Sequence, residues 1–329
     1  MGLEQRTILL PKGREHRVPF EPTPVVKHTK TLDNSFSGEM QRLKGYAELQ
    51  NSGELWRNRT RIDVQSNRPI FPIMPLSDLH LGHRGVDYAA LERRLAFARE
   101  YDVKILLLGD LIDGFIPGKL ASGMVDQAPI RDQVRTATAM LREYQDLILA
   151  NVSTPHHDGW TYQLTGVDLH EFMAKDLDIP LIESGGSVSI AINEVEPYEL
   201  AVFHKIKQYN SSLNLSNASK RVVQLHGEYD PDLVMSGHVH KSTVEVTNQR
   251  GKKRGLIVCG TLKGGDKYGQ REGYIGGVDI DAFPVVFLRT DEKDFTVVES
   301  MKQAGEFIDG TNLLYATAGR SYDVQSIYP

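Results

Sequence analysis

The chain has 329 residues, of which 40% are hydrophobic and 25% charged, and its net charge is −5 at pH 7. This is the composition of a globular protein with one large domain or two small ones. The negative charge argues against a protein that coats nucleic acid through its overall field, although a nuclease with a local basic patch or bound cations stays open. The sequence contains no run of eighteen apolar residues and no apolar segment after Met1, so we expect a cytoplasmic protein without membrane contact.

Residues 1–68 differ from the rest of the chain. Three prolines between positions 19 and 24 predict an extended or irregular segment. A partly helical stretch is expected after Asp33, because apolar residues follow at helical spacing: Phe36, Met40, Leu43 and Ala47. We interpret 1–68 as an N-terminal extension that packs on the main domain or on a partner protein.

Strands and helices alternate from Pro69 onward. The predicted elements, in chain order, are a strand at 70–76, a helix from 87, a strand at 103–108, a helix from 129 and a strand at 147–152. Pro72 and Pro75 should make the first of these strands irregular. This order predicts an α/β fold with parallel strands joined by right-handed crossovers.

The second half of the chain is richer in strands. They are expected at 188–192, 200–203, 234–236, 244–247, 256–259, 275–280 and 285–288. Arg250-Gly251, with the basic residues that follow, reads as a solvated hairpin turn, with nucleic-acid contact as the alternative. Cys259 lies in an apolar run and is expected to be a buried, inert thiol. We assign residues 69–300 to the main domain and 301–329 to a C-terminal tail.

Histidines and acids concentrate in five short segments, each at or just after the end of a predicted strand. The segments are Ser77-Asp78-Leu79-His80, Gly109-Asp110-Leu111-Ile112-Asp113, Pro155-His156-His157-Asp158, Phe203-His204-Lys205 and Ser236-Gly237-His238-Val239-His240. Loops at the carboxyl ends of strands form the binding crevice of α/β sheets, so segments far apart in sequence can converge there.

The residue types indicate a metal site. Asp and His without Cys suit Mn²⁺, Fe or Zn²⁺. The Asp-x-His and His-x-His pairs put two ligands on the same side of an extended segment, and a carboxylate such as Asp110 can bridge two cations. Each segment alone also has a structural explanation, because an Asp or His after a strand is commonly a cap or a buried polar group. The joint occurrence of the segments favours two divalent cations, with Mn²⁺ first.

This set of motifs resembles the calcineurin-like metallophosphoesterase superfamily over about residues 70–290, and its DNA-repair nuclease and phosphodiesterase branch in particular. The resemblance implies a four-layer α/β/β/α sandwich of two mixed sheets, with a dinuclear metal site at the strand C-terminal ends. It implies one metal bound by Asp78, His80, Asp110 and His240. Asp110 would bridge to a second metal held by His204 and His238.

The third segment departs from the family pattern Gly-Asn-His-Asp/Glu. His156 stands where the family has an asparagine ligand of the second metal, and imidazole can replace that ligand. By the resemblance, His157 is the general acid or transition-state stabiliser, Asp113 orients it, and Asp158 supports the site from behind. Trp160 is expected in the core, with base stacking as the alternative.

The sequence therefore predicts a metal-dependent phosphoester hydrolase. We expect a phosphodiesterase acting on DNA, RNA or nucleotides by attack of a metal-activated hydroxide, with His157 protonating the leaving oxygen. Two alternatives stay open: a phosphomonoesterase acting on a small or protein substrate, and a catalytically impaired fold that serves as a binding or structural module.

Overall fold

The structure is a computed structural model, and it describes most of the chain from residue 59 onward. The described residues are 4–10, 14–20, 36–37, 40–41, 44, 59–114, 127–154, 156–174, 177, 179–206, 214–225, 230–264 and 283–317. The strand expected at 275–280, most of the helix expected after Asp33 and the last twelve residues lie outside these ranges. Residues 36–37, 40–41 and 44 are helical.

The first six-stranded sheet contains the strands predicted in the first half of the domain. Its order is β14 (Phe295–Val298), β13 (Val285–Arg289), β4 (Ile70–Leu76), β5 (Lys104–Leu107), β6 (Ile148–Val152) and β7 (Leu181–Ile182). Strands β4 to β7 are parallel, and β13 runs antiparallel to both β4 and β14. The predicted parallel arrangement of 70–76, 103–108 and 147–152 is therefore confirmed.

Strand β4 contains two prolines and still forms a seven-residue strand. It pairs with β13 over 70–73, where Pro72 faces Phe287, and with β5 over 73–76, where Pro75 faces Leu106. Each proline thus has a paired neighbour strand on one side only. A residue without an N–H fits such a position, because no second strand requires a donor from it.

The second six-stranded sheet combines strands from the second half of the chain with one from before residue 69. Its order is β11 (Thr243–Gln249), β12 (Lys252–Val258), β10 (Leu233–Ser236), β9 (Tyr198–Phe203), β8 (Gly186–Ile192) and β3 (Arg59–Val64). Strands β9, β10 and β12 are parallel. Strand β3 lies in the range assigned to the extension. The strands β1 (Glu4–Leu10) and β2 (Arg14–Phe20) form a separate antiparallel pair.

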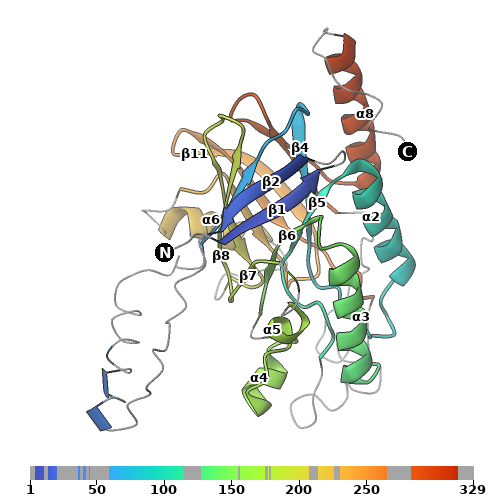
Figure 1. Cartoon of the computed structure of the whole chain (residues 1–329), viewed down its shortest axis with the longest axis vertical. Coiled ribbons are helices and arrows are strands. Elements are labelled where there is room, and N and C mark those ends of the chain that lie inside the picture. The colour runs from blue at the N-terminus through green and yellow to red at the C-terminus, as the bar shows by residue number, and fades with distance from the viewer. Residues whose placement is uncertain are drawn as a thin grey trace.

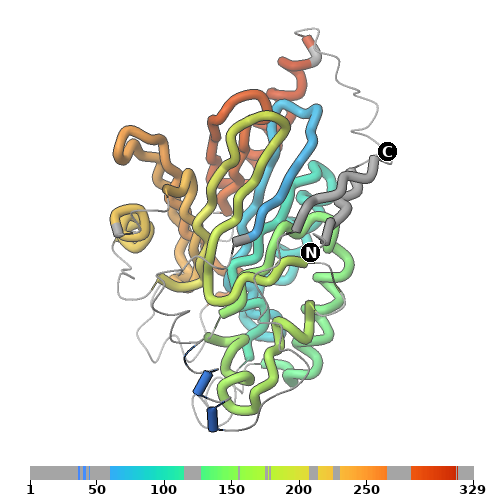
Figure 2. Tube along the Cα trace, turned by 60° about the vertical axis from the view of Figure 1, so that its left-hand side comes forward, coloured from blue at the N-terminus to red at the C-terminus, as the bar shows by residue number. Residues whose placement is uncertain are grey.

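The two sheets pack face to face, and helices cover both outer faces (Figures 1 and 2). The alternation of side chains along β5 shows the layering. Ile105 and Leu107 pack with the helices of the first sheet, whereas Leu106 and Leu108 lie in the core between the sheets. Together with a third cluster between the second sheet and its helix, this gives the α/β/β/α sandwich.

Among the residues described, three long helices cover the first sheet and one covers the second. They are α2 (Tyr88–Tyr101), α3 (Ile130–Glu143) and α8 (Met301–Thr317) on the first, and α6 (Asn217–Leu225) on the second. Figure 2 shows α6 on the opposite side of the sheets from α2 and α3. Helix α8 lies in the range assigned to the tail, and Ala304 and Ile308 are buried in the core. None of the helices described here combines the length and apolarity needed to cross a bilayer.

The basic turn between β11 and β12 is neutralised by neighbouring acids. Arg250 and Gly251 adopt the left-handed conformation that a tight hairpin requires. Lys252 Nζ lies 2.8 Å from an oxygen of Asp232, Lys253 Nζ lies 2.7 Å from Asp294, and Arg254 is buried against Asp230. These pairs favour the structural reading of the turn over nucleic-acid contact.

Candidate metal centre

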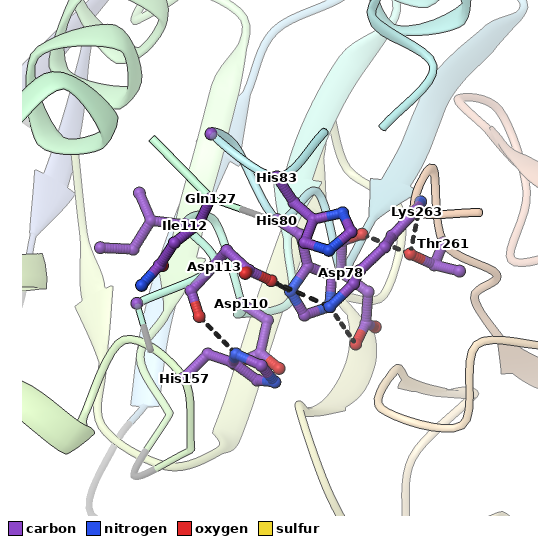
Figure 3. Close-up of polar contacts among 12 residues, drawn as sticks. Asp78, His80, His83, Asp110, Ile112, Asp113, Gln127, His157, Thr261 and Lys263 are labelled. Atoms are coloured by element: carbon purple, nitrogen blue, oxygen red, sulfur yellow. Dashed lines mark hydrogen bonds and ion pairs between the residues drawn. The ribbon is translucent and has the colours of Figure 1, made fainter. Parts of the chain in front are cut away.

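Six loops follow the carboxyl ends of three parallel strands in each sheet. The loops after β4, β5 and β6 carry Asp78 and His80, Asp110 and Asp113, and His156 and His157. The loops after β9 and β10 carry His204, His238 and His240. The sixth loop follows β12 and had no predicted role. The structure therefore brings all nine predicted site residues to one edge of the sandwich (Figure 3 shows five of them).

Five of the predicted ligands have an unusual backbone conformation. Nine described residues other than glycine have a positive φ, and five of these are Asp78, His80, Asp110, His238 and His240, with φ between 46° and 74°. Such conformations cost on the order of 1–3 kcal/mol each and concentrate at functional sites. The left-handed residues allow the chain to turn sharply where each strand ends, which aims neighbouring side chains at a common point.

Asp110 is the centre of the first group of ligand-type side chains. Its Oδ2 lies 3.2 Å from His156 Nδ1 and 3.1 Å from His204 Nε2. The ligand atoms offered by Asp110, His156, His204 and His238 all lie within 4.8 Å of one another. His204 is oriented by its other ring nitrogen, since Nδ1 donates to the carbonyl of Leu108 at 2.8 Å. The imidazole of His156 thus occupies a position from which it can bind a cation.

Asp78 is the centre of the second group. Its Oδ1 lies 3.2 Å from His240 Nε2, and His240 Nε2 lies 3.2 Å from His80 Nε2. The other oxygen, Oδ2, accepts hydrogen bonds from the Ser77 hydroxyl and from the backbone N–H of His238. One carboxylate oxygen is therefore held by the protein, and the other faces the imidazoles. A third group, His80, Asp110 and His157, connects the two.

The chemistry of these atoms fits divalent cations. Asp78 Oδ1 and Asp110 Oδ1 are buried and accept no hydrogen bond from any described residue. A buried carboxylate oxygen that accepts no hydrogen bond is costly in a metal-free protein, and a cation would satisfy it. Ligand atoms about 2.1 Å from one cation lie roughly 3 Å from each other, close to the separations seen around Asp78 and Asp110. Both groups are therefore able to hold a divalent cation.

Burial and charge act in opposite directions on these groups. Burial raises the pKa of Asp78 and Asp110, but the neighbouring imidazoles, His204 first, outweigh it and hold both well below the usual range. Burial also lowers the pKa of His204, but Asp110 and Asp78 raise it to about 9. Burial with the charge of His204 lowers the pKa of His238 to about 3. The carboxylates are thus ionised and His238 is a neutral imidazole, the forms in which both bind metals, whereas His204 carries a second proton that a bound cation would displace.

The two predicted catalytic residues lie beside the predicted metal ligands. His157 Nδ1 lies 2.5 Å from the backbone carbonyl of Asp113, so it is Nδ1 that carries the proton (Figure 3). The carboxylate of Asp113 has different partners: its Oδ1 lies 3.1 Å from His80 Nδ1 and 3.0 Å from Lys263 Nζ. Asp113 therefore contacts His157 through its main chain and His80 through its side chain.

A buried polar chain behind the site includes a residue that no motif indicated. Both oxygens of Asp158 accept backbone N–H groups of the loop between Asp110 and Asp113, from Leu111 and Ile112. His170, on α5 (Leu169–Ala174), contacts Asp158 Oδ2 at 2.6 Å and Asn151 at 3.1 Å. Asp158 thus joins the loop that carries His156 and His157 to the loop that carries Asp110. His170 fits no pattern in the sequence.

Trp160 and His83 are buried. Trp160 is the first residue of α4 (Trp160–Thr165). The centroid of its ring lies 4.4 Å from that of the His157 ring and 5.1 Å from that of the His156 ring. With 7% of its surface exposed it supports these imidazoles and offers little face for base stacking. His83 Nδ1 accepts the N–H of Gly85, and His83 is in none of the three ligand groups.

Gly237 gives the His238 loop the room to approach the β4 loop. A Cβ at this position would lie 1.8 Å from Ser77 Oγ and 2.6 Å from Asp78 Oδ2. We expect Gly237→Ala to displace Asp78 and to lower the free energy of unfolding by about 1–3 kcal/mol, as overpacking does. Urea unfolding and metal content, measured on the same preparation, check this.

Gly310 provides the matched control. It lies inside α8, and a Cβ there would meet no atom within 4 Å. Gly310→Ala should leave metal content unchanged and raise stability by up to about 1 kcal/mol through helix propensity. Unchanged stability and metal content in Gly237→Ala would contradict the close approach of the two loops.

Comparison with known proteins gives weak, fold-level likenesses. No family model and no curated protein matches the chain. Similar solved structures include the phosphoesterase YfcE from E. coli, with 16% identity, a TM-score of 0.36 and coverage of 70% of this chain and 100% of that one. A metallophosphoesterase from Sphaerobacter thermophilus has 15% identity, a TM-score of 0.34 and coverage of 78% and 97%. Vps29 from Entamoeba histolytica, in complex with Zn²⁺, has 11% identity, a TM-score of 0.33 and coverage of 70% and 99%.

The fold and the cluster are defined by this chain's own residues. Two mixed six-stranded sheets lie between helices. Buried Asp and His side chains able to hold metal ions lie at the carboxyl ends of parallel strands. The chain therefore has the α/β fold and the Asp/His cluster that its resemblance to the calcineurin-like metallophosphoesterases implies.

Proposed function

We propose that the chain is a metal-dependent phosphoester hydrolase, and more specifically a phosphodiesterase acting on nucleic acid or nucleotides. The observation that carries the proposal is the pair of adjacent ligand groups around Asp78 and Asp110, each with a buried carboxylate oxygen that accepts no hydrogen bond from the described residues. Two cations held next to each other are suited to phosphoryl transfer.

The ligand assignment follows from the groups. Asp78, His80 and His240 would hold one cation, and His156, His204 and His238 would hold the other. Asp110, which is grouped with His80 as well as with the three imidazoles of the second set, would be shared. When bound, the cations would supply Lewis acidity toward phosphoryl oxygens and lower the pKa of a water to about 7. We assign Mn²⁺ as the first candidate, with Fe and Zn²⁺ as the others, because all three accept mixed oxygen and imidazole ligands.

The protein's own contribution is positioning. The carbonyl of Asp113 holds the Nδ1 proton of His157, so donation to the leaving oxygen requires a second proton on Nε2. Burial lowers the pKa of His157 well below its usual value, and the negative charge of a bound phosphate would favour that second proton. One ring nitrogen of His157 lies within 4.8 Å of ligand atoms of both Asp110 and His80, so this side chain is adjacent to the place where a phosphate would bind. His157 would act on the leaving oxygen, and Trp160 would limit the movement of its ring.

The proposal predicts hydrolysis of bis-p-nitrophenyl phosphate that requires added Mn²⁺ and is lost with a chelator. The reason is that the carboxylates and imidazoles of the site do not by themselves neutralise a phosphate. The same assay with p-nitrophenyl phosphate separates a diesterase from a monoesterase. Single-stranded DNA, RNA and cyclic nucleotides are then tested as substrates. Hydrolysis that is insensitive to chelation, or no turnover with Mn²⁺, Fe²⁺ or Zn²⁺, would contradict the proposal.

A further inference from the structure

The loop after β12 places a buried lysine at the metal centre. Only 5% of the surface of Lys263 is exposed, and its Nζ lies 3.0 Å from Asp113 Oδ1 (Figure 3). The loop is tied to the rest of the site. The Thr261 hydroxyl donates to the carbonyl of Asp78 at 2.7 Å and accepts the N–H of Lys263, while Gly264 N–H donates to the carbonyl of Gly85. These bonds fix the main chain of Lys263 relative to the β4 loop.

Asp113 differs from the other two acids of the centre. Asp78, Asp110 and Asp113 are all fully buried, but only Asp78 and Asp110 belong to groups that can hold a metal ion. Asp113 Oδ1 instead faces two nitrogens, His80 Nδ1 and Lys263 Nζ. A carboxylate on the far nitrogen of a metal-binding imidazole fixes its tautomer and the direction of its other nitrogen. His80 Nε2, the nitrogen on the other side of the ring, faces His240 and Asp78.

We propose that Lys263 is a positioning residue of the metal centre. It holds the Asp113 carboxylate against His80 Nδ1, and so directs His80 Nε2 to the cation and keeps the third acid of the centre out of the ligand set. The charge balance supports this. A buried carboxylate without a counter-charge would itself be drawn to the cations. The ammonium of Lys263 provides that counter-charge at Asp113 Oδ1, the same oxygen that faces His80 Nδ1. The inference rests on the proposed function, because it presupposes cation binding.

A purely structural ion pair is the competing explanation, and the chain contains a matched example. Lys104, at the start of β5, is also buried, and its Nζ lies 2.7 Å from Asp102. Asp110 follows the other end of the same strand, so the Lys104 pair lies at the opposite end of β5 from the metal centre. Methionine has a side chain of similar length to lysine but no charge. Replacing either lysine by methionine therefore removes a buried charge and keeps most of the packing. A structural role predicts that both replacements affect stability alone.

The test is calorimetric titration of the metal-free full chain with Mn²⁺. We expect Lys263→Met to weaken Mn²⁺ binding by about 10- to 100-fold, the usual effect of removing a group that orients a ligand. Lys104→Met should bind Mn²⁺ as the parent does, although both variants unfold at a lower temperature. Parent-like affinity in Lys263→Met would overturn the inference and leave the proposed function intact, whereas an absence of Mn²⁺ binding by the parent would overturn both.

A double variant tests whether Lys263 acts through Asp113. It also leaves no unpaired buried charge at this pair. In Asp113→Asn/Lys263→Met both members of the pair are neutral, so folding does not depend on an unpaired acid. The double variant should bind Mn²⁺ with the same affinity as Asp113→Asn alone, because the second replacement has nothing further to remove. A tenfold or larger additional loss would show that Lys263 acts on the site by another route, and would overturn the inference.

Discussion

Asp110→Asn is expected to remove cation binding and activity together. Asp110 lies in two of the three ligand groups, and its Oδ1 is buried without a hydrogen-bond partner among the described residues. An amide keeps the shape of the side chain but loses the charge and one of the two oxygens that a shared ligand needs. Losing Lewis-acid stabilisation of several kcal/mol corresponds to a fall in kcat of about 10³-fold or more.

The measurement combines metal content with turnover of bis-p-nitrophenyl phosphate in Mn²⁺. Asp63→Asn is the matched control, because this side chain pairs with Arg61 on β3 at the surface and an exposed pair contributes little. It should keep the metal content and rate of the parent. An Asp110→Asn protein that still bound two cations per chain and turned over at the parent rate would rule out Asp110 as a shared ligand.

His157→Gln is expected to leave the cations bound and to slow the reaction in a way that depends on the leaving group. A proton donor accelerates departure of a poor leaving group by about 10²–10⁴-fold and matters much less for p-nitrophenolate. The glutamine amide can still donate to the carbonyl of Asp113, which preserves the packing against Trp160. The loss of kcat should therefore be large on a dinucleotide and small on bis-p-nitrophenyl phosphate.

Two results would contradict this role. An equal loss on both substrates would mean that His157 does not act on the leaving oxygen. A lower metal content in His157→Gln would instead make His157 a ligand, which is a real alternative because it shares a group with His80 and Asp110. Metal analysis of the variant before the kinetic comparison separates these cases.

The parallel strands and the residue types of the site could be predicted from local sequence patterns. Apolar runs of strand length are local, so 70–76, 103–108 and 147–152 were recognisable as strands and 87 as the start of a helix, which the structure confirms. The pairs Asp78-x-His80 and His238-x-His240 are local as well. Because parallel strands bring their carboxyl ends to one edge, the convergence of these segments could be expected before any contact was known.

Which side chains touch across that edge depends on long-range packing that local patterns do not specify. Lys263 follows a strand in a segment without a motif, and His170 lies on a short helix, so their contacts with Asp113 and Asp158 depend on chain separations of 150 and 12 residues. The left-handed backbone of Asp78 and His240 is likewise imposed by long-range packing, since neither residue type requires it. Local periodicity fixes which residues reach the site, whereas the partner of each buried charge follows from how the two sheets and their loops pack.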